Sequence, residues 1–337
     1  MSSADHKTLD GESNNTIENE IHELEQKLEQ AKARLKAREN GLNGKAHDEP
    51  HVSNAASTQY IAQEPSPIPT KAAPKLHPTT HFLLLLSDSA LPLGSFAFSS
   101  GLESYLAHNR RAPSSSALPP SSRSLHSPFD LFLPVSISSY ASTTLPFVLA
   151  AHRDPARLVE LDDHLDAAVI CTVGKRASVA QGRALLGIWE RSFVTSTALS
   201  RPDDDDGAVW RGLGEYSRAL RSPPASWDDA TGLPPVAAHL APLFGVICRV
   251  VGLSLHQTAY VFMLGHVKAL ISAAVRANLF GPYQAQRVLA SSGVQEMISA
   301  AVEREWDTPV EEAGQSVPVM DLWIGRHELL YSRIFNS

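Results

Sequence analysis

The sequence predicts an all-α protein: a single helical bundle domain of about eight to ten helices behind a disordered N-terminal extension. Apolar segments of helical length recur from residue 129 to residue 304, and most are separated by Gly, Pro or Asp-rich breaks. No strand-like alternation of apolar and polar residues competes with them, and no βαβ rhythm is present. Because 43% of the 337 residues are hydrophobic, the chain can bury a sizeable core.

The N-terminal extension covers residues 1–80, which are rich in Glu, Lys, Asn, Ser and Pro and poor in aromatics. Such a composition buries too little apolar surface to offset the entropy of ordering. A helix is predicted near residues 17–38, where a heptad seam of apolar residues runs through Ile17, Ile21, Leu24, Leu28, Ala31 and Leu35. This short helix is marginal alone, so it either stays a solvated single helix or docks on a second chain. Residues 40–80 form a proline-rich linker.

The folded part is predicted to span residues 81–337 as one domain. It begins near His81 with a buried apolar run over residues 82–86. The following Pro-Leu-Gly-Ser-Phe predicts a turn in which Gly94 can take a positive φ and Phe96 is exposed.

A helix over residues 99–108 follows this turn, with Leu102, Tyr105 and Leu106 on one face. Residues 109–128 are rich in Pro and Ser, which predicts a low-complexity insertion without regular structure. Further helical segments are then expected over residues 129–151, 156–173, 175–194, 208–221, 236–251, 254–279 and 283–304.

Two of these segments carry specific signals. Pro134 and Pro146 leave open whether residues 129–151 form one helix or two shorter ones. Residues 254–279 predict the clearest helix, because Ser254 and Gln257 have the spacing of a capping box. Since its residues are apolar nearly all round, we expect this helix at the centre of the bundle.

The bulk properties exclude several classes of protein. The net charge of −7 and the pI near 6.0 argue against a nucleic-acid binder. No apolar signal segment opens the chain, and no run of about 18 apolar residues predicts a membrane-spanning helix. Cys171 and Cys248 each lie in an apolar run, which predicts buried, reduced thiols and a cytoplasmic protein.

No catalytic, cofactor-binding or metal-ligating residue is predicted. The 14 histidines include no His-Glu-x-x-His motif, the chain has no Cys-x-x-Cys pair, and His256 and His266 stand too far apart to share one ion. No nucleophile elbow and no phosphate-binding loop is present either, so nucleotide hydrolysis by this chain is not expected.

Two charged or aromatic segments are candidates for binding a partner. Arg176 and Arg183 lie seven residues apart on one helical face, which is either a solvated surface or a patch for an acidic partner. Residues 317–337 are apolar and aromatic although they end the sequence. Their composition alone divides evenly between packing on the chain's own core and packing on another chain.

Four stretches together resemble the urease accessory protein UreF family, and they lie at residues 90–103, 176–186, 273–286 and 326–337. They include Ala-Leu-Pro-Leu-Gly-Ser-Phe near the start and Tyr-Ser-Arg-Ile-Phe-Asn-Ser at the end. Each is weak alone, but their order and spacing agree over residues 81–337. The likeness is to eukaryotic, fungal members, because the insertion and the long extension depart from compact bacterial forms.

The resemblance implies a non-catalytic, all-α protein that forms a homodimer. It would bridge the scaffold UreD (also called UreH) and the GTPase UreG on apo-urease, so that nickel reaches the urease active site. It also implies that the tail docks on the UreD-type protein and recruits the GTPase, which favours another chain as the tail's partner. The candidate partner-binding residues are Gly94, Phe96, Arg176, Arg183, Arg326, His327, Glu328, Tyr331, Arg333 and Phe335.

Two alternative functions remain. One is an all-α enzyme built from His164 with Asp162, Asp163 and Asp166, although these residues crowd one segment where a solvated face is the usual explanation. The other is a coiled-coil interaction scaffold, unrelated to urease, that depends on residues 17–38.

Overall fold

A computed structural model describes residues 76–111, 127–195, 205–223 and 234–336, together with the single positions 26, 29 and 32. The chain divides into two compact units, residues 1–71 and 72–337. In the first unit the three described positions are helical, and Lys32 Nζ lies 2.9 Å from Glu29 Oε1. The rest of the predicted N-terminal helix and residues 112–126 of the insertion lie outside the described residues, so the domain boundaries stay a prediction.

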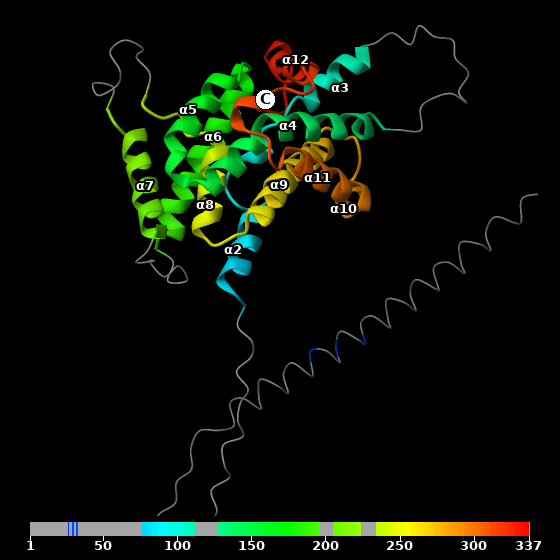
Figure 1. The fold of residues 1–337 in the computed structure, drawn as a ribbon. Coiled ribbons are helices and arrows are strands. Elements are labelled where there is room, and N and C mark those ends of the chain that lie inside the picture. Colours follow the sequence, from blue (N-terminus) through cyan, green and yellow to red (C-terminus); the bar gives the residue numbers. More distant parts are fainter. Residues whose placement is uncertain are drawn as a thin grey trace, which may run out of the picture. The chain divides into compact units, whose positions relative to one another are not determined.

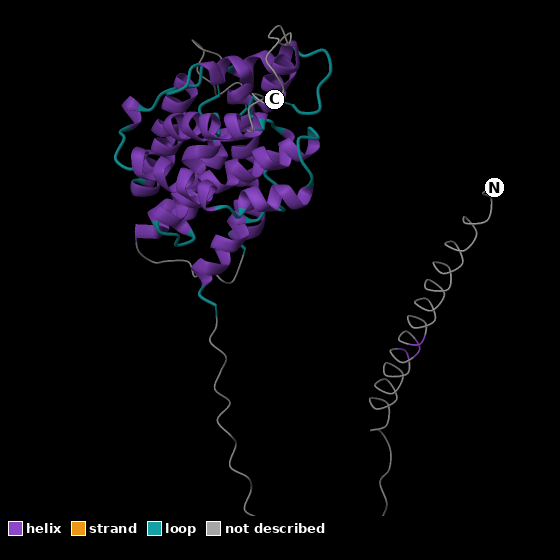
Figure 2. Ribbon diagram, turned by 90° about the vertical axis from the view of Figure 1, so that its right-hand side faces the viewer, coloured by secondary structure: helices purple, strands orange, loops and turns teal. Residues whose placement is uncertain are grey.

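The second unit is built from α-helices, and the described residues contain no strand (Figures 1 and 2), which confirms the predicted all-α fold. The helices are α2 (Pro78–Ser87), α3 (Leu102–Arg111), α4 (Pro128–Arg153), α5 (Leu158–Ala168), α6 (Thr172–Ile188), α7 (Asp205–Leu220), α8 (Leu240–Val250), α9 (Leu255–Arg276), α10 (Pro282–Leu289), α11 (Ser292–Glu305) and α12 (Val319–Arg326). Short helical turns add η1 (Ser95–Ala97), η3 (Pro155–Arg157), the π-helical η4 (Trp189–Phe193), η6 (Val310–Glu312) and η7 (His327–Leu329).

The core forms where α4 packs against α8 and α9. Gly245 allows a close crossing, because a Cβ built there would lie 2.3 Å from the Val148 carbonyl oxygen. At the start of α9, Ser254 Oγ accepts a hydrogen bond from Gln257 N, and Ser254 N donates to Gln257 Oε1. The predicted capping box and the central place of this helix are therefore confirmed.

α4 is one continuous helix although Pro134 and Pro146 lie inside it. Proline has no N–H, so Pro146 leaves the Ser142 carbonyl without its helical donor. Gly314 N supplies that hydrogen bond from the segment before α12, at 3.1 Å. A tertiary contact thus settles the question that the sequence left open.

Other boundaries differ from the prediction for local reasons. The segment expected over 283–304 is two helices, since Ser291 Oγ accepts from Val294 N and begins α11. The chain becomes helical at Pro78, three residues before His81. Within α2, Phe82 and Leu86 are buried, whereas Leu84 is exposed. The run over residues 82–86 is therefore one buried face of a helix and not a buried segment throughout.

α4 and α9 are long and apolar enough to cross a membrane by length and composition. In each, 61% of the most apolar window is buried inside the bundle. Core helices of this kind meet the same criterion, so these two helices are weak evidence for a membrane protein.

Candidate functional site

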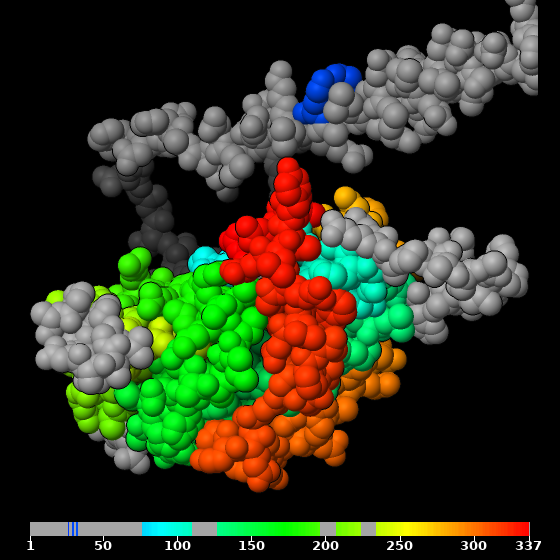
Figure 3. All heavy atoms as spheres, turned by 90° about the horizontal axis from the view of Figure 1, so that it is seen from above, coloured from blue at the N-terminus to red at the C-terminus, as the bar shows by residue number. Residues whose placement is uncertain are grey.

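The C-terminal segment lies across one face of the bundle. Figure 3 shows α12 and the residues after it in red, between the α5–α6 region and α3. α12 approaches α3 closely at Gly101, whose φ is +87° and whose Cβ position would lie 3.1 Å from Trp323 Cβ. The Trp323 ring also packs edge-on against the Tyr105 ring, with centroids 5.6 Å apart. Glycine at residue 101 therefore permits both the local backbone and the helix contact.

The last residues are held by one carboxylate, that of Glu103 on α3. It accepts hydrogen bonds from His327 Nε2 at 2.8 Å, Ile334 N at 2.7 Å and Phe335 N at 3.2 Å. A further hydrogen bond joins Asn336 N to the Ala97 carbonyl oxygen at 2.8 Å. The tail is thereby fixed to the chain's own core beside η1.

The tail divides its side chains between the core and solvent. His327 and Phe335 are buried, with 0% and 5% of their surface exposed. Four large apolar side chains around them stay exposed, and we name them the tail patch: Phe96, Leu329, Tyr331 and Ile334. The sequence predicts that the tail packs either on the chain's own core or on another chain. In the structure the tail packs on its own core and also presents an exposed apolar surface.

Four of the candidate residues are arginines. Arg176 donates to Glu328 Oε1 at 2.7 Å, and its guanidinium holds the pKa of that carboxyl below its usual range. Arg183, Arg326 and Arg333 are exposed, and within the described part of the chain none of the three forms an ion pair.

Arg276, the last residue of α9, lies between two aromatic rings at the edge of the tail patch. Its guanidinium carbon is 4.3 Å from the Phe335 ring centroid and 5.8 Å from that of Phe96. One of its amino groups donates to the Phe96 carbonyl oxygen. Glu103 and Arg276 were absent from the predicted site, although both lie in the stretches that resemble the UreF family.

The turn before the tail patch has the expected conformation. Gly94 has φ +74° and precedes η1, which places Phe96 at the surface with 63% of its area exposed. A Cβ at Gly94 would meet no atom within 4 Å. The backbone conformation, and not the available space, therefore explains glycine at this position.

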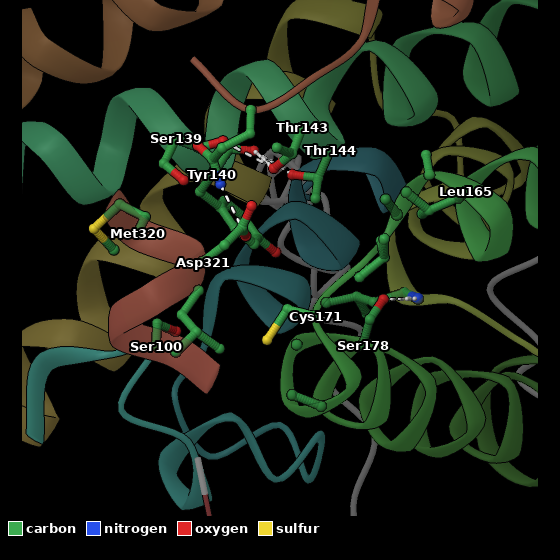
Figure 4. Close-up of a pocket in the computed structure, with 18 of the residues that line it drawn as sticks. Ser100, Ser139, Tyr140, Thr143, Thr144, Leu165, Cys171, Ser178, Met320 and Asp321 are labelled. Atoms are coloured by element: carbon green, nitrogen blue, oxygen red, sulfur yellow. Dashed lines mark hydrogen bonds between the residues drawn. The ribbon is translucent and has the colours of Figure 1, made fainter. Parts of the chain in front are cut away.

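A cavity of about 320 Å³ lies between α4, α6 and α12 (Figure 4). Hydroxyl groups are frequent on its wall, and the lining residues include Ser139, Tyr140, Thr143, Thr144, Ser178 and Asp321. Cys171 also lines it and is half-buried, which corrects the prediction of a fully buried thiol, whereas Cys248 is buried. Among the described residues, no group of three His, Cys, Asp or Glu side chains could hold a metal ion.

The four residues of the alternative enzyme site do not converge. His164 and Asp163 face solvent, whereas Asp162 is buried and accepts hydrogen bonds from three backbone N–H groups, those of Ala237, Ala238 and His239. Asp162 therefore fixes the irregular segment that leads into α8.

Asp166 binds Lys175 Nζ at 2.6 Å and His239 Nε2 at 3.0 Å, and His239 Nδ1 lies 3.0 Å from Ser178 Oγ. Burial alone would raise the pKa of the Asp166 carboxyl, but the hydrogen bonds from Lys175 and His239 outweigh it and lower that pKa. His239 is fully buried, and Leu240 N also donates to Ser178 Oγ. These contacts join α5, α6 and the start of α8 and describe a structural network.

The comparisons with known proteins agree on one family. The UreF family model matches residues 132–293. An uncharacterized urease accessory protein UreF-like protein of Schizosaccharomyces pombe is 38% identical over 261 residues, which cover 77% of this chain and 97% of the relative. This chain belongs to the UreF family of urease accessory proteins.

More distant members of the UreF family match over similar lengths. Urease accessory protein F of rice (Oryza sativa subsp. indica) is 33% identical over 258 residues, which cover 74% of this chain and 82% of the relative. Urease accessory protein 6 of Cryptococcus neoformans var. grubii is 26% identical over 310 residues, which cover 76% and 96%. Membership of the UreF family gives the chain a role in urease maturation.

The UreF family match covers only part of the candidate site. It runs from Phe132 in α4 to Gly293 in α11 and includes Arg176, Arg183 and Arg276. The turn at Gly94 and the whole tail lie outside it. The structure joins the two parts, because the tail rests on Arg276 and contacts Arg176 through Glu328.

Proposed function

We propose that the chain is an adaptor, without turnover of its own, that bridges a UreD-type accessory protein and a UreG-type GTPase on apo-urease during nickel insertion. We propose further that it acts in the cytoplasm as a homodimer within this complex and that nickel is cargo. Residues 81–337 form the functional domain in this proposal. Its family membership supports a role in urease maturation, and the tail patch supports binding as the means.

The tail patch is the observation that carries the proposal. Isolated exposed apolar residues are common, but a group of large ones on a fixed backbone is typical of a protein–protein interface. Glu103 fixes the backbone of residues 334 and 335, so little conformational entropy would be lost on binding. Arg326 and Arg333 add positive charge that suits an acidic partner surface.

The candidate residues take two roles in this proposal. The exposed ones, Phe96, Arg326, Tyr331 and Arg333, would contact a partner directly, and so would Arg183 on α6. The remaining ones would hold the surface in place: Gly94 through its turn, Arg176 and Glu328 through their ion pair, and His327 and Phe335 through burial.

Co-purification with the UreD-type protein and the UreG-type GTPase tests the proposal. Tyr331 is fully exposed, so Tyr331→Asp should leave the fold intact and weaken partner binding at least about tenfold, as for a central aromatic contact. Val159→Asp is the matched control, since Val159 is an exposed apolar residue in the first turn of α5. Equal binding by the Tyr331→Asp variant would remove the tail patch from the interface.

A coiled-coil scaffold remains the alternative function, but most of residues 17–38, its apolar seam included, lie outside the described part of the chain. Deleting residues 1–80 separates the two proposals. The adaptor should still bind its partners without them, whereas a scaffold built on residues 17–38 should not.

A further inference from the structure

Arg276 is a half-buried cation without an acidic partner. Its Nε is buried and has no hydrogen-bond partner, and within the described residues no carboxylate pairs with Arg276. Glu103, the α3 carboxylate that holds the tail, is already bound to His327 and to two backbone N–H groups. Since an unpaired cation loses hydration on burial, its pKa is lowered, and the site is stabilised by any anion that reaches it.

The guanidinium is held in a fixed orientation. The Phe335 ring lies against it at 4.3 Å, the Phe96 ring lies at 5.8 Å, and the bond to the Phe96 carbonyl sets its rotation. Because Nε is buried and one amino group donates to the Phe96 carbonyl oxygen, the donors left for a ligand are the remaining N–H bonds of the two amino groups at the outer edge of the guanidinium. A planar carboxylate matches that edge with two parallel bonds, and the fixed orientation removes the entropy cost of ordering the arginine.

The surroundings of Arg276 indicate the kind of molecule that would bring the carboxylate. Phe96, whose ring contacts the guanidinium, is exposed, and so is Ile334, the neighbour of Phe335 in the chain. A small anion would leave these apolar side chains uncovered. An acidic residue flanked by apolar ones would satisfy the cation and cover both side chains. Arg333, exposed on the same segment, favours the same charge.

We propose that Arg276 is a preformed receptor for one Asp or Glu side chain of the partner protein that covers the tail patch. This inference rests on the proposed function, because it names the contact by which that partner is recognised. Arg276 would act as a binding residue at the edge of the tail patch, and Phe96 and Phe335 would position it.

The test measures the affinity of the UreD-type protein and of the UreG-type GTPase for the variants Arg276→Gln and Arg276→Lys and for the control Arg287→Gln. Arg287 is exposed on α10, so its loss removes the same charge from another part of the surface. We expect Arg276→Gln to bind about thirtyfold more weakly, as for a desolvated arginine contact, and Arg276→Lys to restore only part of the loss, because a lysine lacks the planar fork. Binding within twofold of wild type by Arg276→Gln would overturn the inference.

The partner's acidic residue is then found by changing its surface Asp and Glu residues singly to Asn and Gln. One of these changes should weaken binding to the wild-type chain and have no further effect on the Arg276→Gln variant. Additive losses for every pair would contradict a direct contact. If phosphate competes with the partner as well as acetate does, the site binds anions in general. The proposal that Arg276 is a specific receptor for an Asp or Glu side chain is then wrong.

A partner-free measurement distinguishes this inference from the proposed function. In the free chain, the Arg276 Nε–H signal is followed by nitrogen NMR during titration with acetate. A saturable shift at Arg276 and none at Arg287 supports a carboxylate receptor even if neither accessory protein binds. No shift would count against the receptor, whatever the accessory proteins do. Circular dichroism of each variant confirms that the helices are retained.

Discussion

Single carboxylates fix two irregular segments of this chain. Glu103 holds two backbone N–H groups of the tail, and Asp162 holds three of the segment before α8. A buried carboxylate is stabilised by such hydrogen bonds, and losing it would leave the donors unsatisfied. Asp162, which the sequence offers as a catalytic candidate, therefore stabilises the fold.

Glycines at helix crossings are the second kind of decisive residue. We predict that Gly245→Ala destabilises the protein by about 1–3 kcal/mol, because the new methyl group would lie 2.3 Å from the Val148 carbonyl oxygen and neither backbone can move freely. Thermal or denaturant unfolding measures the change. Gly265→Ala on α9 is the control, since no atom lies within 4 Å of its Cβ position, and it should be neutral or slightly stabilising. Equal effects of the two substitutions would contradict the close crossing.

At the scale of elements, the sequence predicts most helices and fails where tertiary contacts decide. The capping box at Ser254 is local, so the start of α9 could be predicted. The continuity of α4 could not, because the bond from Gly314 N to the Ser142 carbonyl spans 172 residues (314 − 142). Ser291 is a local N-cap signal that divides the apolar segment 283–304 into two helices, whereas its apolar pattern alone predicts one.

In the candidate site, too, features set by neighbouring residues could be predicted from the sequence, and features set by tertiary contacts could not. A Pro-Leu-Gly-Ser-Phe turn predicts an exposed Phe96, and this is confirmed because a turn depends on neighbouring residues. The burial of His327 and Phe335 depends on Glu103 and Arg276, which lie far away in the sequence. Residue chemistry alone could not distinguish the tail residues that face the core from those that face solvent.

We predict that Glu103→Gln loosens the tail without unfolding the bundle. The neutral amide accepts hydrogen bonds more weakly than the carboxylate that now holds His327 and residues 334 and 335. Amide hydrogen exchange should therefore speed up at Ile334 and Phe335, whereas the amides of α9 should keep their protection. Glu296→Gln, at an exposed position on α11, should change neither. Unchanged exchange at the tail would show that other contacts hold it.

For the whole molecule, the proposed binding surface combines the start and the end of the helical bundle. The turn at Gly94 lies near the start of the described domain and the tail lies at its end, and they meet over the last residue of α9. Half of the buried core residues belong to α4, α8 and α9, which lie beneath the surface, so partner binding can be altered at the surface without loss of the core. This separation makes the proposed function testable in cells.

The most direct test measures urease activity and the nickel content of urease in cells that lack this protein and express either wild type or the Tyr331→Asp variant. The adaptor proposal predicts that wild type and the control Val159→Asp restore active, nickel-loaded urease. Tyr331→Asp should restore neither, although it accumulates to the same level with the same helicity. Active, nickel-loaded urease in cells without the protein, or with only the Tyr331→Asp variant, would contradict the account.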